Sequence, residues 1–203
     1  MQRAAAEVFA SVGYANATTA DIAARAGLPP GSLHYHIVSK EQLLFDVLSN
    51  GMRNATNRLE RLINTEAPAA DRLYTYLKDI IRTNCERRDS GLTLNFFFLQ
   101  SDFLEPDNRA TYMHARDEYE HLLRRVVQEG MDSGEFKESN VALEIRLILG
   151  AVSWINIWYR SGGSLTAEEV AEWYARRLVE GLMTRSRDLA GVPIPPDPDA
   201  DAL

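Results

Sequence analysis

Residues 9–48 constrain this chain more than any other stretch, because they combine several helix start and stop signals at close spacing. Thr18 followed by Asp21 is the capping-box pattern that starts a helix. Gly27 can end that helix because glycine tolerates a positive φ. Ser39 begins a second capping box ahead of a longer helix. The helices expected in this region lie near residues 2–12, 19–26, 30–36 and 40–63.

The second and third of these helices fit a helix-turn-helix, in which a tight turn joins two short helices and the second enters the major groove of DNA. Helix 30–36 would direct hydroxyl, phenol and imidazole groups outward, where they can reach base edges and phosphates. The free N–H groups at the start of helix 19–26 favour a phosphate, and Lys40 would clamp the DNA backbone. The alternative for Tyr35 is a place in the core. The predicted DNA contacts are Thr18, Thr19, Ser32, His34, Tyr35, His36 and Lys40.

The order of these motifs resembles the DNA-binding domain of the TetR family of bacterial transcriptional repressors. The matching segments are FASVGY, TTADIAARAG, GSLHYH and SKEQLL, which together cover most of residues 4–48. The resemblance implies an all-helical homodimer that binds a palindromic operator and releases it when a small molecule enters a larger C-terminal domain. Pro29-Pro30 departs from the family pattern, which tends to place polar or basic residues there. TetR-like chains also carry several more residues before the first helix, so we expect a preceding segment.

The remainder of the chain is also predicted to be helical, because apolar residues recur at helical spacing and no stretch alternates as a strand would. We therefore expect an all-α protein with a three-helix helix-turn-helix domain over residues 1–48 and a ligand-binding and dimerisation domain over residues 49–186. The proline- and aspartate-rich residues 187–203 are expected to form a disordered tail. The further helices are expected near residues 70–87, 91–103, 107–132, 139–160 and 166–185.

Two of these helices are predicted to form the interface of a homodimer. Helix 139–160 is hydrophobic almost all round, which indicates burial on both sides. Helix 166–185 carries an apolar stripe of its own. Two such helices from each subunit would make a four-helix bundle across a two-fold axis. The predicted interface residues are Leu149, Val152, Val170, Trp173, Tyr174, Leu178 and Gly181.

Residues 153–182 are similar to one branch of the family, the regulators of fatty-acid and steroid-ring breakdown. The resemblance implies that the inducer is an acyl-CoA thioester, which needs an apolar slot and cations for its phosphates. One alternative is that the ligand is a lipophilic drug or aromatic compound. Another is that no ligand is involved at these positions, so that the phenylalanines of this domain pack in the core and its arginines lie in solvent. The predicted pocket residues are Phe96, Phe97, Phe98, Arg116, Trp154 and Trp158.

The charge of the chain limits the ways in which it can bind nucleic acid. The net charge of −7 argues against a protein that coats nucleic acid non-specifically. Residues 1–50 hold three basic and four acidic residues, so phosphate contacts must depend on helix N-termini, hydroxyls and imidazoles. This weak charge and Pro29-Pro30 also allow an adaptor whose DNA-binding domain is degenerate.

Enzymatic and membrane functions are not expected. The chain has no Gly-rich phosphate loop, metal-ligand spacing or nucleophile elbow, so we expect neither catalysis nor a metal nor a cofactor. The paired histidines at 34 and 36 point to different faces of a helix and do not form a metal pair. Cys85 is the one cysteine, which agrees with a reducing cytoplasm. The apolar run 147–159 is too short to cross a bilayer.

Overall fold

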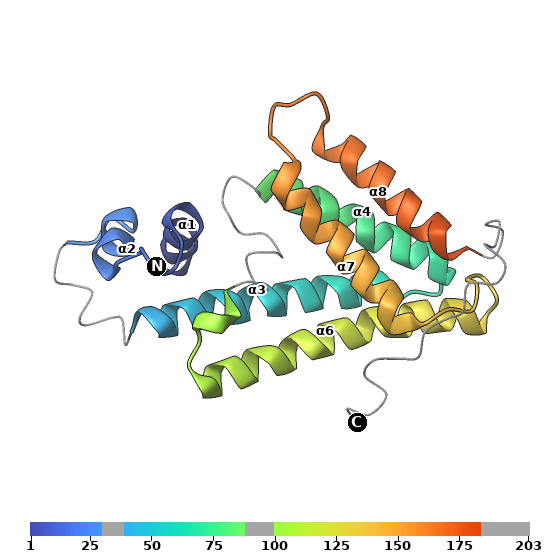
Figure 1. Cartoon of the computed structure of the whole chain (residues 1–203), viewed down its shortest axis with the longest axis horizontal. Coiled ribbons are helices and arrows are strands. Elements are labelled where there is room, and N and C mark those ends of the chain that lie inside the picture. The colour runs from blue at the N-terminus through green and yellow to red at the C-terminus, as the bar shows by residue number, and fades with distance from the viewer. Residues whose placement is uncertain (30–38, 88–99, 184–203) are drawn as a thin grey trace. The chain divides into compact units, whose positions relative to one another are not determined.

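The computed structural model describes residues 1–29, 39–87 and 100–183 (Figure 1). These residues form helices and no named strand; the single isolated β-bridge joins Phe136 to Met183. The prediction of an all-α protein is therefore confirmed. The elements are α1 (Gln2–Val12), α2 (Thr19–Arg25), α3 (Lys40–Ile63), α4 (Ala69–Arg87), the 3-10 turn η3 (Ser101–Phe103), α6 (Pro106–Asp132), α7 (Val141–Trp158) and α8 (Ala167–Leu182).

Most predicted helix boundaries agree with the structure to within a few residues. The exception is the helix expected over residues 91–103, because its last three residues form a 3-10 turn and Leu104 is extended. Proline disfavours a helical conformation in the residue before it but suits a first helical position. The new helix accordingly begins at Pro106. The predicted helix 30–36, most of the predicted helix 91–103 and the predicted tail 187–203 lie outside the described residues.

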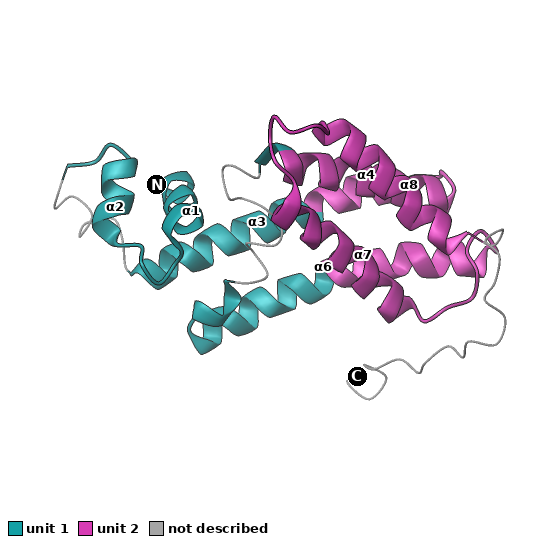
Figure 2. Cartoon of the chain, turned by 45° about the horizontal axis from the view of Figure 1, so that its top comes forward, with its two compact units in different colours: residues 1–56, 86–118 teal, residues 57–85, 119–203 magenta. Residues whose placement is uncertain are grey.

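The chain divides into two compact units (Figure 2). The first unit comprises residues 1–56 and 86–118, and the second comprises residues 57–85 and 119–203. Helices α3, α4 and α6 contribute residues to both units, and neither unit is a single stretch of chain. The predicted domain limits at residues 48 and 186 stay a prediction.

In the first unit, α2 begins as the sequence predicts. The Thr18 hydroxyl accepts a hydrogen bond from the Asp21 N–H at 3.1 Å, and the Asp21 carboxylate accepts one from the Thr18 N–H at 2.9 Å. The hydrogen bonds from the Thr18 side chain and then from its backbone lower the pKa of Asp21. Gly27 follows with a φ of 69°, a left-handed conformation that favours glycine. The apolar faces of α1 and α2 are buried through residues such as Phe9 and Ile22.

The second unit has a core with a buried pair of phenols. Tyr76 of α4 and Tyr119 of α6 share a hydrogen bond between their hydroxyls, and their rings meet edge to face at 6.5 Å. Both side chains are almost fully buried, and burial raises the pKa of Tyr119 to about 12 and that of Tyr76 well above its usual value. Both phenols therefore stay neutral, and each hydroxyl has a partner in the core.

Helix α8 is joined to α4 by a polar network centred on Glu172. The Glu172 carboxylate accepts hydrogen bonds from the Tyr74 hydroxyl at 2.6 Å and from Arg176 at 2.8 Å, and it pairs with Lys78 at 2.8 Å. These bonds, the one from Lys78 first, lower the pKa of Glu172 to about 2. The network fixes how α8 lies on α4, although ion pairs this exposed add little stability.

Helix α7 is long and apolar enough, by length and composition alone, to cross a membrane, and it is the one described helix of which this holds. It extends further than the apolar run recognised in the sequence. A core helix of a soluble protein passes the same test. One side of α7 is buried within the second unit, through Ile145, Ile148, Val152 and Ile155.

The start of α4 is capped from a distant part of the chain. The Glu135 carboxylate accepts hydrogen bonds from the backbone N–H groups of Ala69 at 3.1 Å and Ala70 at 3.0 Å. Burial raises the pKa of Glu135, but the hydrogen bonds from Ala70, Ala69 and Ser133 together outweigh it and lower the pKa. The turn that carries Glu135 depends on Gly130, because a Cβ there would collide with the ring of Phe136.

We predict that Glu135→Ala destabilises the protein by about 1 kcal/mol, the usual cost of a lost helix cap. The pKa of Glu135 is lowered on folding, so its contribution is full above the unfolded pKa near 4.5 and is lost as the pH falls through the folded value. The free energy of unfolding in urea, measured at pH 7 and pH 3.5, should show the difference from wild type shrinking at acid pH. Glu138→Ala, three residues on at an exposed position, is the matched control. An equal loss of unfolding free energy in both variants would contradict the role of Glu135 as a helix cap.

Candidate functional site

The predicted DNA-contacting residues divide into two groups. Ser32, His34, Tyr35 and His36 lie outside the described residues, so their contact with DNA stays a prediction. Thr18, Thr19 and Lys40 lie within the first unit. Thr18 and Thr19 are exposed at the N-terminus of α2, and the Thr18 hydroxyl is engaged by Asp21 as a helix cap. Capping and a phosphate contact are compatible, because the Thr18 hydroxyl takes only one of the N–H groups that the start of a helix leaves open, that of Asp21.

Lys40 has a structural task that sequence reasoning missed. Its ammonium donates hydrogen bonds to the carbonyl oxygens of Tyr14 and Ala17, both at 3.0 Å. The same ammonium lies 4.4 Å from the centre of the Tyr14 ring, a cation–π contact. Lys40 therefore holds the turn that precedes the N-cap of α2, and one of its three N–H groups is left for a phosphate. A backbone clamp by Lys40 stays a prediction.

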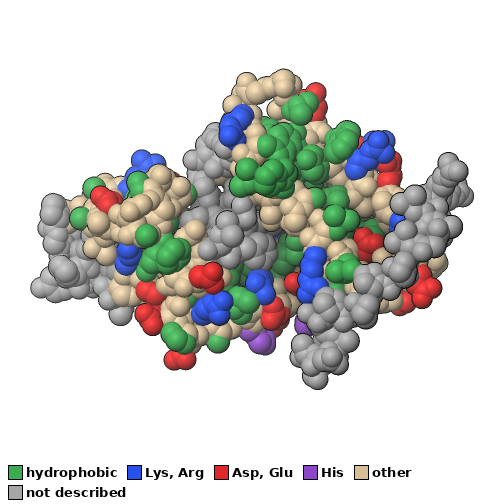
Figure 3. Space-filling model, in the orientation of Figure 1, with side chains coloured by type: hydrophobic (Ala, Val, Ile, Leu, Met, Phe, Trp, Pro, Cys, Tyr) green, Lys and Arg blue, Asp and Glu red, His purple; other side chains and the backbone are tan. Residues whose placement is uncertain are grey.

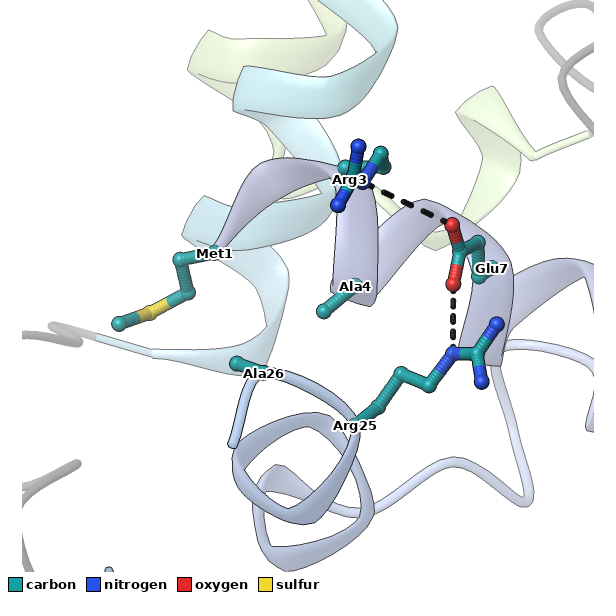
Figure 4. A pocket seen from close by; sticks show the side chains of 6 residues that line it. All are labelled: Met1, Arg3, Ala4, Glu7, Arg25 and Ala26. Atoms are coloured by element: carbon teal, nitrogen blue, oxygen red, sulfur yellow. Dashed lines mark hydrogen bonds and ion pairs between the residues drawn. The ribbon is translucent and has the colours of Figure 1, made fainter. Parts of the chain in front are cut away.

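Two arginines of the first unit, Arg3 and Arg25, are paired with one carboxylate (Figure 4). Glu7 of α1 binds the Arg25 side chain at 2.5 Å and lies 3.8 Å from that of Arg3. These residues line a pocket of about 370 Å³ together with Met1, Ala4 and Ala26. Sites for lipophilic ligands are mostly apolar, whereas three charged side chains line this one. The pocket therefore does not suit an acyl chain.

The predicted pocket residues do not come together among the described residues. Phe96, Phe97 and Phe98 lie outside them. Arg116 is half-buried beside Asp117, with 3.4 Å between the charged groups. Trp158 stacks on Tyr174 of α8, with ring centres 6.1 Å apart. Trp154 is 62% exposed in the single chain, and its place in a ligand pocket stays a prediction. It lies on an outer face of α7.

That outer face is rich in exposed apolar side chains from α7 and α8, and we call it the α7–α8 face. On α7 it follows Leu143, Leu147, Gly150, Trp154 and Ile157, at alternating spacings of four and three residues. Leu147 is 63% exposed, and nothing occupies the space beside Gly150. On α8 the face includes Trp173, which is 59% exposed, and Gly181. Hydrophobic side chains gather over the end of α7 and the start of α8 in Figure 3.

The α7–α8 face refines the predicted interface. Val152 and Val170 are each 2% exposed and pack inside the second unit, so assigning them to an interface was wrong. The helical period places Val152 about 200° around α7 from Trp154, and Val170 packs inward one turn before Trp173. Leu149, Tyr174 and Leu178 are half-buried at the edge of the face. Leu143, Leu147 and Ile157 lie on the α7–α8 face but were not among the predicted interface residues, although the alternating spacing of four and three residues was visible in the sequence. Large exposed apolar patches of this kind mark protein–protein contacts.

Comparisons with known proteins agree with this architecture. Residues 66–182 match the family model described as Tetracyclin repressor-like, C-terminal domain, and residues 3–47 match that of the bacterial regulatory proteins of the tetR family. The HTH-type transcriptional repressor KstR2 of Rhodococcus jostii is 29% identical over 182 residues, covering 88% of this chain and 87% of the relative.

Solved structures share the fold. The ketosteroid transcriptional regulator KstR2 of Mycobacterium tuberculosis has a TM-score of 0.78 at 24% identity, covering 91% of this chain and 93% of that one. AibR in complex with isovaleryl coenzyme A and operator DNA has a TM-score of 0.74 at 23% identity, covering 90% and 97%. Both halves of the predicted resemblance are thus confirmed, and the chain belongs to the TetR family of bacterial transcriptional regulators.

Proposed function

We propose that this protein is a cytoplasmic homodimeric repressor that binds a palindromic operator through residues 30–36 and leaves it when an acyl-CoA thioester binds in the C-terminal half. The observation that carries the proposal is the alignment of both halves of the chain with one repressor, KstR2. The similarity to AibR, solved with isovaleryl coenzyme A and operator DNA, supports the class of ligand. These relatives regulate transcription, which argues against an enzyme.

The α7–α8 face supports the homodimer. It is apolar, and its alternating spacings of four and three residues are those of helices that pack side by side. A second copy of the same face would cover it across a two-fold axis. Two-fold symmetry in the protein matches the palindromic operator, whose half-sites lie about 34–36 Å apart.

The mechanism depends on α3, which starts beside the turn before α2 and continues into the second unit. A ligand bound under α3 would tilt this helix and change the separation of the two recognition segments. The ligand has to bind the DNA-incompetent arrangement more tightly than the competent one. A coupling free energy of about 1–3 kcal/mol would weaken operator binding roughly 5- to 150-fold.

A second candidate, a ligand-binding adaptor with a degenerate DNA-binding domain, has one observation in its favour. Arg25 is paired with Glu7 and Lys40 is hydrogen-bonded to two carbonyls, so these cations are partly engaged within the first unit. The two candidates differ in DNA binding. An adaptor would retard no fragment of its own promoter in a gel, at any salt concentration.

We predict that Leu147→Glu dissociates the dimer. A carboxylate at the centre of an apolar interface costs several kcal/mol per subunit unless it is paired, so the dissociation constant should rise at least about a hundredfold. Sedimentation equilibrium across a range of protein concentrations measures this directly. Asn54→Glu, which adds the same charge at an exposed position of α3, should leave the dimer intact. A Leu147→Glu variant that stays dimeric would show that the α7–α8 face is not the dimer interface.

We predict that Tyr35→Ala and His36→Ala each weaken operator binding by about 1–3 kcal/mol, which is roughly 5- to 150-fold, because each removes a contact to DNA from both subunits. Fluorescence anisotropy with a labelled promoter fragment gives the affinity. His121→Ala, an exposed histidine of α6, is the control. The thermal midpoint should be unchanged in all three variants. Affinity as strong as that of wild type in both test variants would refute the DNA-contacting role of this segment.

We predict that acyl-CoAs stabilise the protein more than their separate parts do. A ligand at a hundred times its dissociation constant adds about 2.7 kcal/mol, which corresponds to a rise of roughly 5–10 °C in the thermal midpoint. The panel comprises isovaleryl-CoA, longer acyl-CoAs, free CoA, free acids and cationic drugs. If free acids or drugs stabilise the protein and no thioester does, the ligand is another lipophilic compound and not an acyl-CoA.

A further inference from the structure

Glu41 connects two parts of the first unit that are far apart in the sequence. It lies in the first turn of α3. One carboxylate oxygen accepts a hydrogen bond from the backbone N–H of Glu105 at 3.1 Å. Both oxygens lie 3.1 Å from the side-chain nitrogen of Asn108. The partners are 64 and 67 residues away along the chain, at the very start of α6.

The charge of Glu41 is suited to this position. Helix α6 has 27 residues, and the N-terminus of a long helix carries a partial positive charge and N–H groups without partners. Pro106 at its first position has no N–H to offer, so Glu105 and Asn108 supply the donors. Hydrogen bonds to an ionised carboxylate are stronger than those between neutral groups. Glu41 therefore acts as a cap that is borrowed from α3.

A second contact joins the residues just before α6 to the same part of the first unit. The ring of Phe103, just before α6, packs on the ring of Tyr14 with 5.0 Å between centres. Tyr14 in turn packs on Phe9 of α1 at 5.3 Å and lies under the ammonium of Lys40. Burial, followed by the nearby charges of Glu41 and Glu105, raises the pKa of Tyr14. The start of α6 is thus joined to α1, to the turn before α2 and to the first turn of α3.

Helix α6 is continuous from this junction to Asp132. Its residues up to 118 belong to the same compact unit as α1 and α2, and its residues from 119 onward belong to the second unit. A helix transmits displacement along its axis because its hydrogen bonds run end to end. A displacement of the whole helix along its axis would therefore act on the residues that Glu41 and Tyr14 hold.

We propose that Glu41 is a positioning residue that fastens the start of α6 to the helices around the DNA-binding segment, so that they respond to DNA as one body. The inference rests on the proposed function for its biological meaning, since the linked body is the one that would bind the operator. It adds a defined contact, Glu41 to Glu105 and Asn108, that a ligand-driven movement of α6 has to strain or break.

Hydrogen–deuterium exchange tests the contact first in the free protein. Glu41→Ala and Asn108→Ala should each speed exchange in residues 104–112 about tenfold, and Glu41→Gln, which keeps one acceptor oxygen but loses the other and the charge, should fall between them and wild type. Glu60→Ala is the matched control, because Glu60 is an exposed glutamate of the same helix. Unchanged exchange in both test variants, with melting midpoints near that of wild type, would overturn the proposal.

The second arm adds a promoter fragment from the protein's own gene. In wild type the DNA should slow exchange in residues 14–27 and also in residues 104–112. In Glu41→Ala the DNA should still protect residues 14–27. At least three-quarters of the protection that DNA adds at residues 104–112 in wild type should be absent from the variant. Equal protection of both segments in the variant would overturn the coupling. If DNA protects no segment of wild type, the proposed function fails, and the free-protein arm still decides whether Glu41 fastens α6.

Discussion

The fold depends on supplying acceptors for the backbone N–H groups that every helix leaves open at its start. In this protein hydroxyls and carboxylates supply many of them. Thr18 caps α2, Asn140 caps α7 and Thr166 caps α8, each through a residue three positions on. Helices α4 and α6 are capped by glutamates from elsewhere in the chain. Where the acceptor comes from decides whether a cap only starts a helix or also positions it.

The distant caps organise the two compact units. Glu135 ties the turn after α6 to the start of α4 within the second unit, and Glu41 ties α3 to the start of α6 within the first. Arg72 adds two contacts near the start of α4. It donates a hydrogen bond to the carbonyl oxygen of Ile63 at 3.0 Å and pairs with Glu129 at 2.7 Å. Such contacts are directional, so they set where a helix lies more precisely than apolar packing alone does.

The α7–α8 face is the surface that we propose for the assembly of two copies of the chain. Its apolar residues stay open to water in the protomer, while the opposite sides of both helices form the core of the second unit. A helix that is hydrophobic all round needs two apolar surroundings. The first is the protomer's own core, and the proposed second is another copy of this chain. The same division explains why Val152 and Trp154, two residues apart on α7, have opposite environments.

The sequence by itself determined most boundaries of the described helices, because caps, glycine turns and prolines act over three or four residues and can be read locally. It also determined the family, through four motifs in order. Only the tertiary structure decided that Lys40 turns inward to Tyr14 and Ala17, that Trp154 is exposed, and that Glu41 and Glu135 cap distant helices. Periodicity shows that a residue lies on an apolar stripe but not which neighbour covers it. A partner 64 residues away leaves no local pattern, since the fold alone brings the two together.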